Sequence, residues 1–248
     1  MTPAPPAVVM YDVWAGTVVY EEALRWQRLL AAARAEDAID DVLLTLEHDR
    51  VYTAGRHADL DRNVLGTSDI RVVAIDRGGD VTYHGPGQLV AYPITRLPHA
   101  KAVRPFVEAL EQACVRTALD YGISAVPDRR RPGVWVGRDK LAAVGVRING
   151  GVTSHGLAFN VTTDLTDFGG LIPCGIADAG VCSLRSLGVE TTVEAVRARL
   201  VGHLAAALDR RLQPAAPAAL GLSAAADPAA PERRVSLTGA GRAPGPRR

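Results

Sequence analysis

The hydrophobic pattern alternates between helical and strand-like segments from about residue 7 to residue 212. The first helical face consists of apolar residues three or four positions apart, namely Val19, Ala23, Trp26, Leu30 and Ala33. The segment DVLLTLEH, at 41–48, follows this face and indicates a buried strand. A helix that packs on a sheet is therefore expected at the start of the domain.

Six further strand candidates are short and lie close together in the chain. They are RVVAID (71–76), VTYH (81–84), QLVAYPI (88–94), GVWV (133–136), KLAAVGVRI (140–148) and VTSHGLAFNV (152–161). Neighbours joined by so few residues leave no room for helical crossovers, and the short connection through Arg77, Gly78 and Gly79 suggests an antiparallel hairpin. The expected fold class is α+β, with a mainly antiparallel or mixed sheet.

Two more helices are predicted from single apolar faces. The first face contains Val103, Phe106, Val107, Leu110, Cys114, Ala118 and Tyr121, which makes Cys114 a core residue. The second contains Val193, Val196, Leu200, Leu204 and Leu208. Thr191 and Glu194 stand in capping-box spacing in front of the second helix, which predicts its first turn.

Composition and charge exclude several classes of protein but favour none. Hydrophobic residues make up 48% and charged residues 22% of the chain, which is ordinary for a globular protein. A formal net charge of +1 gives no basic field, so nucleic-acid binding is not expected. Neither an export signal nor an apolar run of about 18 residues is visible, so no membrane association is expected. Three cysteines without CxxC spacing fit a reducing cytoplasm, where free thiols persist.

Residues 213–248 are dominated by Ala, Pro, Gly and Arg and carry no sustained apolar period. A segment of this kind buries too little apolar surface to fold, so an unstructured tail is expected. A basic arm that grips a partner is the alternative, because the tail holds five arginines. Residues 1–212 are expected to form a single domain and the protein to be a monomer.

Common signatures of nucleotide and metal sites are missing from the chain. There is no GxxxxGK[ST] segment and no GxGxxG after a strand, so the usual phosphate-binding loops are absent. The six histidines are never three or four residues apart, so no helical pair of metal ligands is visible, although ligands from distant segments stay possible. No cofactor and no metal are expected.

Three segments differ from ordinary scaffold. The first, RGGDVTYHGPGQLVAYPI at 77–94, holds four glycines around Tyr83 and His84, which indicates either close approach of a ligand to the backbone or two consecutive β-turns. The second, GRDKLAAVGVRI at 137–148, places Lys140 at the start of an apolar strand, where a lysine is usually a solvated charge.

The third segment, GLIPCGIADAGVCSL at 170–184, holds two cysteines. Cys174 lies between a proline and a glycine, which predicts an exposed and reactive thiol, whereas Cys182 lies on an apolar stretch and is expected to pack. A free thiol is only about 3% ionised at pH 7, and a neighbouring ammonium group would raise that fraction. Cys174 therefore needs a cationic partner, and spacing alone does not show that Lys140 reaches it.

Four of these motifs resemble the lipoate-pathway octanoyltransferases. RGGDVTYHGPGQ, GVWVGRDKLAAVGVRI, SHGLAFNV and IPCGI occur in that family's order and approximate spacing, and the resemblance covers roughly residues 10–205. The resemblance implies the fold of biotin and lipoate protein ligases, with one larger and one smaller sheet flanked by helices.

The resemblance also implies an activity and a set of partners. It implies transfer of an octanoyl group from octanoyl-acyl carrier protein to a lysine of lipoyl domains, as found in 2-oxoacid dehydrogenase complexes and in the glycine cleavage H protein. Cys174 matches the family's nucleophile, and Lys140 matches its activating lysine. Because the donor is already a thioester, the reaction needs no ATP.

Three segments match the family's acyl-binding segments. They contain Arg77, Gly78, Gly79, Asp80, Val81, Thr82, Tyr83 and His84, then Ala143, Val144 and Gly145, and finally Gly156, Leu157 and Ala158. Tyr83, His84 and His155 are candidates for the pocket wall or a proton relay, with structural hydrogen bonding as the alternative. Backbone N–H groups near Gly78, Gly79 or Cys174 are candidates for the oxyanion site.

Two rival functions and one docking hypothesis remain open at this point. An ATP-dependent lipoate or biotin ligase would share the scaffold, and a non-catalytic acyl-binding protein would share the pocket but would need neither Cys174 nor Lys140. The basic segment at 129–131 is a candidate contact for the acidic carrier protein, against the alternative of a solvated loop.

Overall fold

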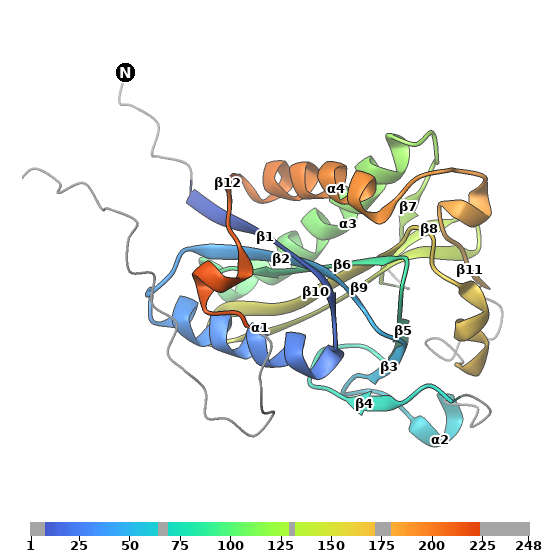
Figure 1. The fold of residues 1–248 in the computed structure, drawn as a ribbon, viewed down its shortest axis with the longest axis horizontal. Helices are drawn as coiled ribbons and strands as arrows, with labels where there is room; N and C mark the ends of the chain where they lie inside the picture. The colour runs from blue at the N-terminus through green and yellow to red at the C-terminus, as the bar shows by residue number, and fades with distance from the viewer. Residues whose placement is uncertain (1–7, 64–68, 129–131, 172–179, 224–248) are drawn as a thin grey trace, which may run out of the picture.

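The computed structural model describes residues 8–63, 69–128, 132–171 and 180–223. Within them, the strands form one large and one small sheet (Figure 1). The order in the large sheet is β12 (Arg210–Pro214), β1 (Val8–Val18), β2 (Asp41–His48), β6 (Gln88–Ile94), β10 (Val152–Asn160), β9 (Asp139–Asn149), β8 (Val134–Val136) and β7 (Val126–Pro127), with β11 (Gly180–Val181) paired to β9. The small sheet has the order β4 (Val72–Ala74), β3 (Val51–Ala54) and β5 (Val81–His84).

Both sheets are mixed. In the large sheet, β1 runs parallel to β2 and β12. Each neighbouring pair along the rest of the sheet, in the order β2, β6, β10, β9, β8 and β7, is antiparallel. This arrangement confirms the α+β class and the expected pair of a larger and a smaller sheet.

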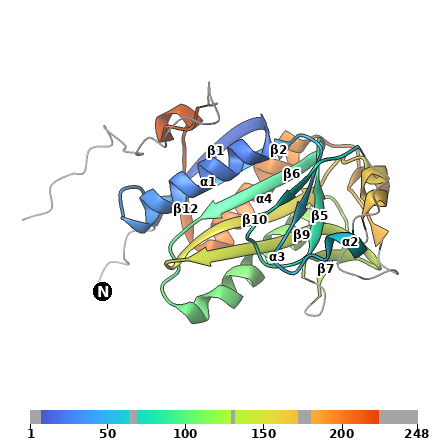
Figure 2. The ribbon, with the colours of Figure 1, turned by 90° about the horizontal axis from the view of Figure 1, so that it is seen from below.

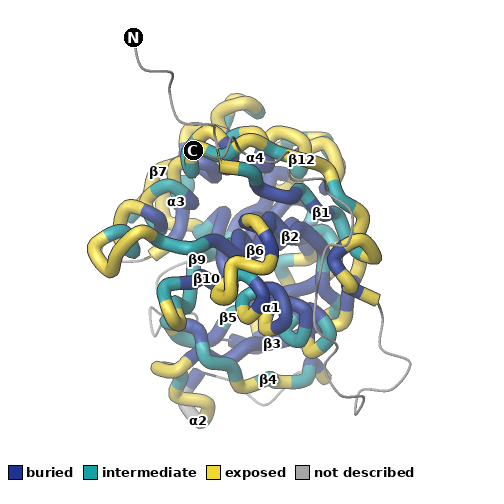
Figure 3. The backbone as a smooth tube through the Cα atoms, turned by 90° about the vertical axis from the view of Figure 1, so that its left-hand side faces the viewer, coloured by how far each residue is buried: buried dark blue, intermediate teal, exposed yellow. Residues whose placement is uncertain are grey.

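Helices cover both faces of the large sheet. Helix α1 (Tyr20–Ala35) lies on one face, whereas α3 (Val103–Leu119) and α4 (Val193–Leu208) lie on the other (Figures 1 and 2). The four-residue helix α2 (Leu60–Asn63) and the 3-10 helices η1 (Ala100–Ala102), η2 (Leu165–Gly170), η4 (Arg185–Leu187) and η5 (Pro217–Leu220) complete the described part. Because both faces are covered, the central strands are buried along most of their length, as Figure 3 shows for β2 and β6.

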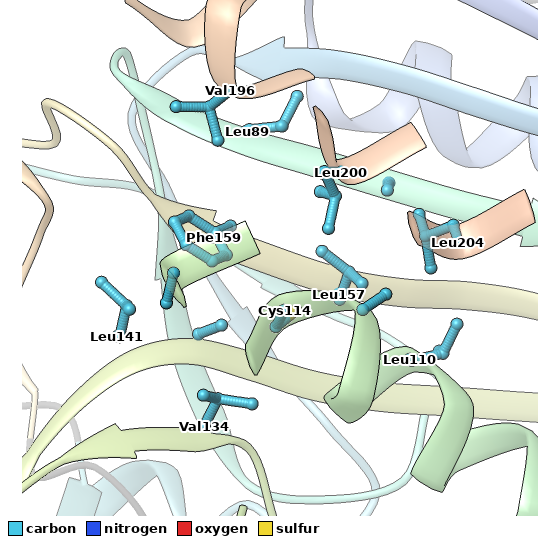
Figure 4. Packing of buried hydrophobic residues seen from close by; sticks show 14 of the residues in the cluster. Leu89, Leu110, Cys114, Val134, Leu141, Leu157, Phe159, Val196, Leu200 and Leu204 are labelled. Carbon is cyan, nitrogen blue, oxygen red and sulfur yellow. The ribbon is translucent and has the colours of Figure 1, made fainter. Parts of the chain in front are cut away.

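The core beneath α3 and α4 contains two of the three cysteines. Cys114 is fully buried and lies among the side chains of Leu157, Phe159 and Leu200 (Figure 4). Cys182 is 3% exposed and belongs to the same cluster. Burial raises the pKa of both thiols, for Cys182 to about 12, so both are protonated at neutral pH. The prediction that these two cysteines pack in the core is confirmed.

The expected hairpin between the strands at 71–76 and 81–84 is wrong. Strand β3 lies between β4 and β5, since Thr53 pairs with Val73 on one side and Thr82 on the other. Residues 77–80 therefore do not form a tight turn but cross towards the large sheet, where the Gly78 N–H donates to the Val146 carbonyl at 3.3 Å. Only four residues long, β3 carries too little pattern to be recognised in the sequence.

The start of α4 also differs from the prediction by one residue. Thr192, not Thr191, is the N-cap, and its Oγ1 accepts a hydrogen bond from the Ala195 N–H at 3.2 Å. The hydroxyl of Thr191 instead contacts the Tyr121 hydroxyl at 3.3 Å. Glu194 consequently lies too early for a capping box, but its charge still favours the positive end of the helix.

The domain extends beyond the expected boundary at residue 212. Strand β12 continues to Pro214 parallel to β1, and η5 follows it. Leu220 and Leu222 are buried against the core beneath α1, and the Ser223 carbonyl accepts a hydrogen bond from Arg25 at 3.0 Å. Two leucines in an Ala- and Pro-rich segment give no period, which explains why the sequence pattern missed them. Residues 224–248 lie outside the described part of the chain. Among the described residues, no helix is long and apolar enough to cross a membrane.

Candidate active site

A pocket lies between the β9–β10 hairpin and the segment that leads through residues 77–84 into β5. The space that it encloses, together with its open mouth, is about 680 Å³. The lining residues are Tyr20, Arg77, Gly78, Gly79, Asp80, Val81, Thr82, His84, Tyr92, Pro132, Lys140, Ala143, Val144, Gly145, His155, Gly156, Leu157 and Ala158. The three segments singled out as acyl-binding thus meet at one pocket, and Lys140 lies in its wall.

Tyr83 is the one residue of these segments that does not line the pocket. Side chains alternate along β5, so Thr82 and His84 face the pocket while Tyr83 faces the core of the small sheet. Its hydroxyl donates to Asp167 Oδ2 at 2.6 Å, and Asp167 also pairs with Arg50 at 2.6 Å. Tyr83 therefore connects η2 to the small sheet. This is the structural hydrogen bonding that was expected as the alternative to a role in the pocket wall.

Cys174 lies outside the described residues, as does the basic segment at 129–131. The residues at both ends of the gap around Cys174 are fixed. Leu171 is buried in the core of the small sheet, and Gly180 begins β11, which pairs with Asp139 and Lys140 of β9. The first described residues after Cys174, Gly180 and Val181, thus lie beside the strand that holds Lys140.

Two glycines of the hairpin allow the pocket wall to form from backbone. A Cβ atom on Gly156 would lie 2.1 Å from the Ala91 carbonyl oxygen of β6 and 2.8 Å from the ring of Pro93. A Cβ on Gly145 would lie 3.2 Å from the side chain of Arg77. Gly156 is therefore required by the packing of β10 on β6, whereas Gly145 leaves room for the segment that closes the pocket.

The Arg77 side chain braces the segment above the pocket. Its guanidinium is 8% exposed and donates to the Gly78 carbonyl at 3.0 Å and to both oxygens of Thr53 at 3.1 and 3.2 Å. The Gly78 N–H is already bound to Val146, so it is not available to an oxyanion, contrary to one of the sequence hypotheses. Asp80 holds the same segment by accepting from Asn63 and from the Val81 N–H at 2.8 Å.

Lys140 is half-buried at the start of β9. Its ammonium lies 4.8 Å from the centre of the Trp135 ring, which favours the cation through the ring's electron density. Pro132 and Gly133 precede Trp135, and a Cβ on Gly133 would lie 3.5 Å from Lys140 Cε. The Lys140 backbone is thus paired with β8 and with β11, and the residue lies in the pocket wall.

Buried histidines and tyrosines form the inner wall. Nδ1 of His48 donates to the Val18 carbonyl at 2.8 Å, and its Nε2 therefore accepts from the Tyr92 hydroxyl at 2.7 Å. Burial lowers the pKa of His48 to about 4. The ring of Tyr20 stacks on His84 with 5.9 Å between centres, and burial together with His48 lowers the pKa of His84 well below its usual value. These side chains are all uncharged at neutral pH.

His84 is oriented by a chain of hydrogen bonds beneath the pocket. Gln88 Nε2 donates to Tyr83 O at 3.1 Å and to Asn160 Oδ1 at 3.0 Å, so Gln88 Oε1 accepts from His84 Nδ1–H at 2.7 Å. The acceptor nitrogen Nε2 of His84 is thereby fixed. The HGPGQ motif forms a tight turn from β5 into β6, with the Gln88 N–H bound to the Gly85 carbonyl at 3.2 Å. Gly85 and Gly87 thus lie in a β-turn, which was the alternative to close approach of a ligand to the backbone.

His155 closes one end of the pocket. It is 3% exposed, and its Nε2 lies 3.2 Å from Asp76 Oδ1, while Asp76 also pairs with Arg147. Burial, and then the charges of Arg77 and Arg147, lower the pKa of His155 to about 3, so the neutral ring donates this hydrogen bond.

Sequence reasoning missed Tyr20, Tyr92 and Pro132 at this site, and also His48, which does not line the pocket but accepts the hydrogen bond of Tyr92. These residues come from four segments far apart in the chain, and each fits its own element as an ordinary apolar or turn residue. A tyrosine at the start of α1 and a histidine at the end of β2 give no local signal of a shared site. Among the described residues, no group of three His, Cys, Asp or Glu side chains is placed to hold a metal ion.

Comparison with known proteins gives a consistent set of relatives. The family model for the lipoyl protein ligase A/B catalytic domain matches residues 19–205. An octanoyltransferase of Solibacter usitatus is 44% identical over 207 residues, covering 81% of this chain and 94% of that protein. An octanoyltransferase of Rhodococcus jostii is 46% identical over 209 residues, covering 79% and 80%.

A solved structure has the same fold at low sequence identity. The crystal structure of lipoate-protein ligase A bound with ATP superposes with a TM-score of 0.70, covering 84% of this chain and 90% of that one. Its sequence identity is 16%, so the likeness shows the shared fold alone.

Proposed function

Because the chain belongs to the octanoyltransferases, within the lipoyl protein ligase A/B catalytic-domain family, we propose that it transfers octanoyl from octanoyl-acyl carrier protein to a lysine of lipoyl domains. The enzyme is an acyltransferase of lipoate metabolism. The single observation that best supports the finer proposal is the pocket along β9 and β10. It has Lys140 in its wall and is also lined by the uncharged His84 and His155 and by Tyr20 and Tyr92. Such a wall favours binding of an alkyl chain, because binding does not require a charged histidine to lose its hydration.

The first half-reaction forms an acyl-enzyme. The Cys174 thiolate attacks the carbonyl carbon of the donor thioester, and the bond between that carbon and the carrier sulfur breaks. Lys140 stabilises the thiolate while it is protonated and then gives its proton to the departing carrier thiolate. The pairing of β11 with Asp139 and Lys140 supports this role, since Gly180 lies only six residues after Cys174 in the chain.

The second half-reaction returns the enzyme to its starting state. The neutral amine of the acceptor lysine attacks the thioester carbon, and its surplus proton passes to the Lys140 amine. The Cys174 thiolate leaves, and the amide product is released. Donor and intermediate are both thioesters, so the acyl group is already activated and the cycle consumes no nucleotide.

The test is a transfer assay with octanoyl-acyl carrier protein and an isolated lipoyl domain, without ATP. We expect octanoylation of the lipoyl domain by the native chain and none by Cys174→Ser. Cys182→Ala is the matched control, because Cys182 is a buried thiol in the same polypeptide segment and should leave transfer largely intact. A requirement for ATP and free octanoate would instead favour a ligase.

A further inference from the structure

A second cavity lies beneath α1 at the far end of the β9–β10 hairpin. Its lining is partly apolar, through Leu24, Ala31, Ala32, Ala35 and Val152, and partly polar, through Gln27, Arg28, Asp76, Arg147, Asn149 and Ser154. His155 lines this cavity as well as the acyl pocket, so one side chain forms a wall of both.

The register of the hairpin puts the two cavities end to end. The acyl pocket uses Lys140 to Gly145 of β9, whereas the second cavity begins at Arg147. Val146 pairs with His155, and Gly145 with Gly156, so the boundary falls at the same point on both strands. From Lys140 to Gly145 the strand runs about 17 Å at the usual rise per residue. His155 is thus at the end of the pocket opposite to the reactive lysine.

Local backbone structure turns His155 into this position. Its φ of +57° is left-handed, which interrupts the regular alternation of β10. Pairing of β10 with β6 covers only Leu157 to Asn160 of β10. Beyond this stretch β6 contains Pro93, which has no N–H to donate to β10.

The His155 backbone and ring are both held in place. Its N–H donates to Gln27 Oε1 at 2.7 Å, its Nε2 contacts Asp76 at 3.2 Å, and its ring meets Tyr92 edge-on with 6.3 Å between centres. Gln27 is 1% exposed, and its Nε2 has no hydrogen-bond partner among the described residues. The oxygen of the Gln27 amide thus binds the His155 backbone, while the nitrogen of the same amide is buried and unsatisfied. Because an unsatisfied buried group costs free energy, the position of His155 is constrained by the fold.

We propose that His155 is the end wall of the acyl pocket and sets the longest acyl chain that the enzyme accepts. The proposal rests on the proposed function, because it takes the acyl carbonyl to lie near Lys140 and the chain to run along β9 and β10. Without the imidazole ring the two cavities join, and a longer chain continues past Val146 towards Leu24, Ala31 and Val152.

The experiment compares the full-length chain with His155→Gly, using octanoyl-, decanoyl- and dodecanoyl-acyl carrier protein as donors. Glycine removes the side chain and accepts the left-handed backbone. We expect the ratio of kcat/KM for dodecanoyl to that for octanoyl to rise at least tenfold, because each newly buried methylene is worth about fourfold in affinity. Ser154→Ala is the matched control, since Ser154 lines only the second cavity, and it should leave the ratio unchanged.

Folding of each variant is checked by its melting temperature. If His155→Gly does not fold, His155→Asn supplies the same comparison, because asparagine tolerates a left-handed φ and is smaller than histidine. An unchanged ratio in a folded variant overturns the role of His155 while octanoyl transfer stands. Should the native chain fail to use any donor, the proposed function fails, and calorimetric binding of octanoate and dodecanoate to both proteins still tests the wall.

Discussion

Lys140 combines an apolar setting with a titratable amine. Its stem lies beside Gly133, its ammonium lies over Trp135, and it lines the pocket proposed to bind the acyl chain. A lysine that served only as a solvated charge would not need to lie in a pocket wall beside an aromatic ring. Its position therefore supports a role in the reaction.

Replacing Lys140 separates charge from proton transfer. Lys140→Ala should lower the rate of octanoyl transfer by about a hundredfold or more, as loss of a general acid and base does. Lys140→Arg keeps the positive charge but cannot give up a proton near neutral pH, so it should remain slow. Single-turnover rates measure both effects. Near-native transfer by Lys140→Arg would show that charge alone is needed, and an unchanged melting temperature would exclude a folding defect.

The buried histidines predict an acid-sensitive fold. The folded pKa values of His48 and His155 are about 4 and about 3, below the unfolded value of about 6.5. The unfolded chain therefore binds protons first, so their contribution is complete above pH 6.5 and is lost as the pH falls towards 4. The free energy of unfolding should fall by up to about 1.4 kcal/mol per pH unit for each histidine in this window.

Urea unfolding between pH 7.5 and 4.5 measures this loss. His48→Gln is the control, because the amide keeps a donor for Val18 and an acceptor for Tyr92 but does not titrate. It should flatten the slope while lowering stability at pH 7.5. An equal slope in the native chain and this variant would mean that His48 does not contribute.

Residue types and motif order indicated the site, whereas its inner wall could not be predicted. The match of four motifs gave Lys140 and the three segments that line the pocket. Tyr20 and Tyr92 meet there, with His48 in contact with both, only because α1, β2 and β6 pack together, which no local pattern encodes. Tyr83 is different, since strict alternation along β5 would have placed it opposite Thr82 and His84.

Strands β6 and β10 define the floor of the pocket at the scale of elements. Their close approach depends on Gly156, where any Cβ would meet the Ala91 carbonyl. Pro93 in β6 and the left-handed His155 in β10 then interrupt the regular pairing of the two strands, and contact resumes at Thr153, whose hydroxyl donates to the Pro93 carbonyl at 2.7 Å.

Gly156→Ala should therefore destabilise the protein by about 3 kcal/mol or more, because backbone must move to admit the methyl group. The midpoint of urea unfolding measures the change. Gly169→Ala is the matched control, since no atom lies within 4 Å of the position of its Cβ, and it should leave the midpoint nearly unchanged. A similar midpoint for both variants would contradict the close packing of β10 on β6.

Long elements with one apolar face were predictable, and short or connecting ones were not. Helices α1, α3 and α4 are 16 or 17 residues long and carry more than four turns of periodic pattern, so their existence follows from sequence. Strands β3 and β11 are four and two residues long, and their pairing is decided by contacts with β5 and β9. The hairpin interpretation failed because segment 77–80 binds the large sheet instead of turning back.

At the scale of the whole molecule, the folded domain includes more of the C-terminal segment than the composition of that segment suggests. Leu220 and Leu222 are buried against the α1 core, and β12 completes the edge of the large sheet beside β1. Each buried leucine contributes about 1.5–3 kcal/mol. The true boundary of the domain therefore lies at or after Ser223.

Two truncations test this boundary. A chain ending at Ser223 should keep the native melting temperature and transfer activity, whereas one ending at Leu212 should lose several kcal/mol of stability. Differential scanning calorimetry measures both. Full stability of the shorter chain would mean that η5 and the end of β12 are dispensable. Loss of activity in a fully stable chain ending at Ser223 would point to a function of residues 224–248.

The contact of the basic segment at 129–131 with the carrier protein stays a prediction, as does the monomeric state. Pro132 follows that segment directly and lines the acyl pocket, so a carrier bound there would be close to Lys140. Local positive charge would attract an acidic carrier without requiring a basic protein overall.

The proposed acyl-enzyme is tested most directly by the intact mass of the protein after incubation with octanoyl-acyl carrier protein in the absence of ATP. The expected result is a single octanoyl adduct that maps to Cys174 and is released by hydroxylamine, as a thioester is. Absence of the adduct, or the same labile adduct on the Cys174→Ser variant, would contradict a mechanism through this thiol.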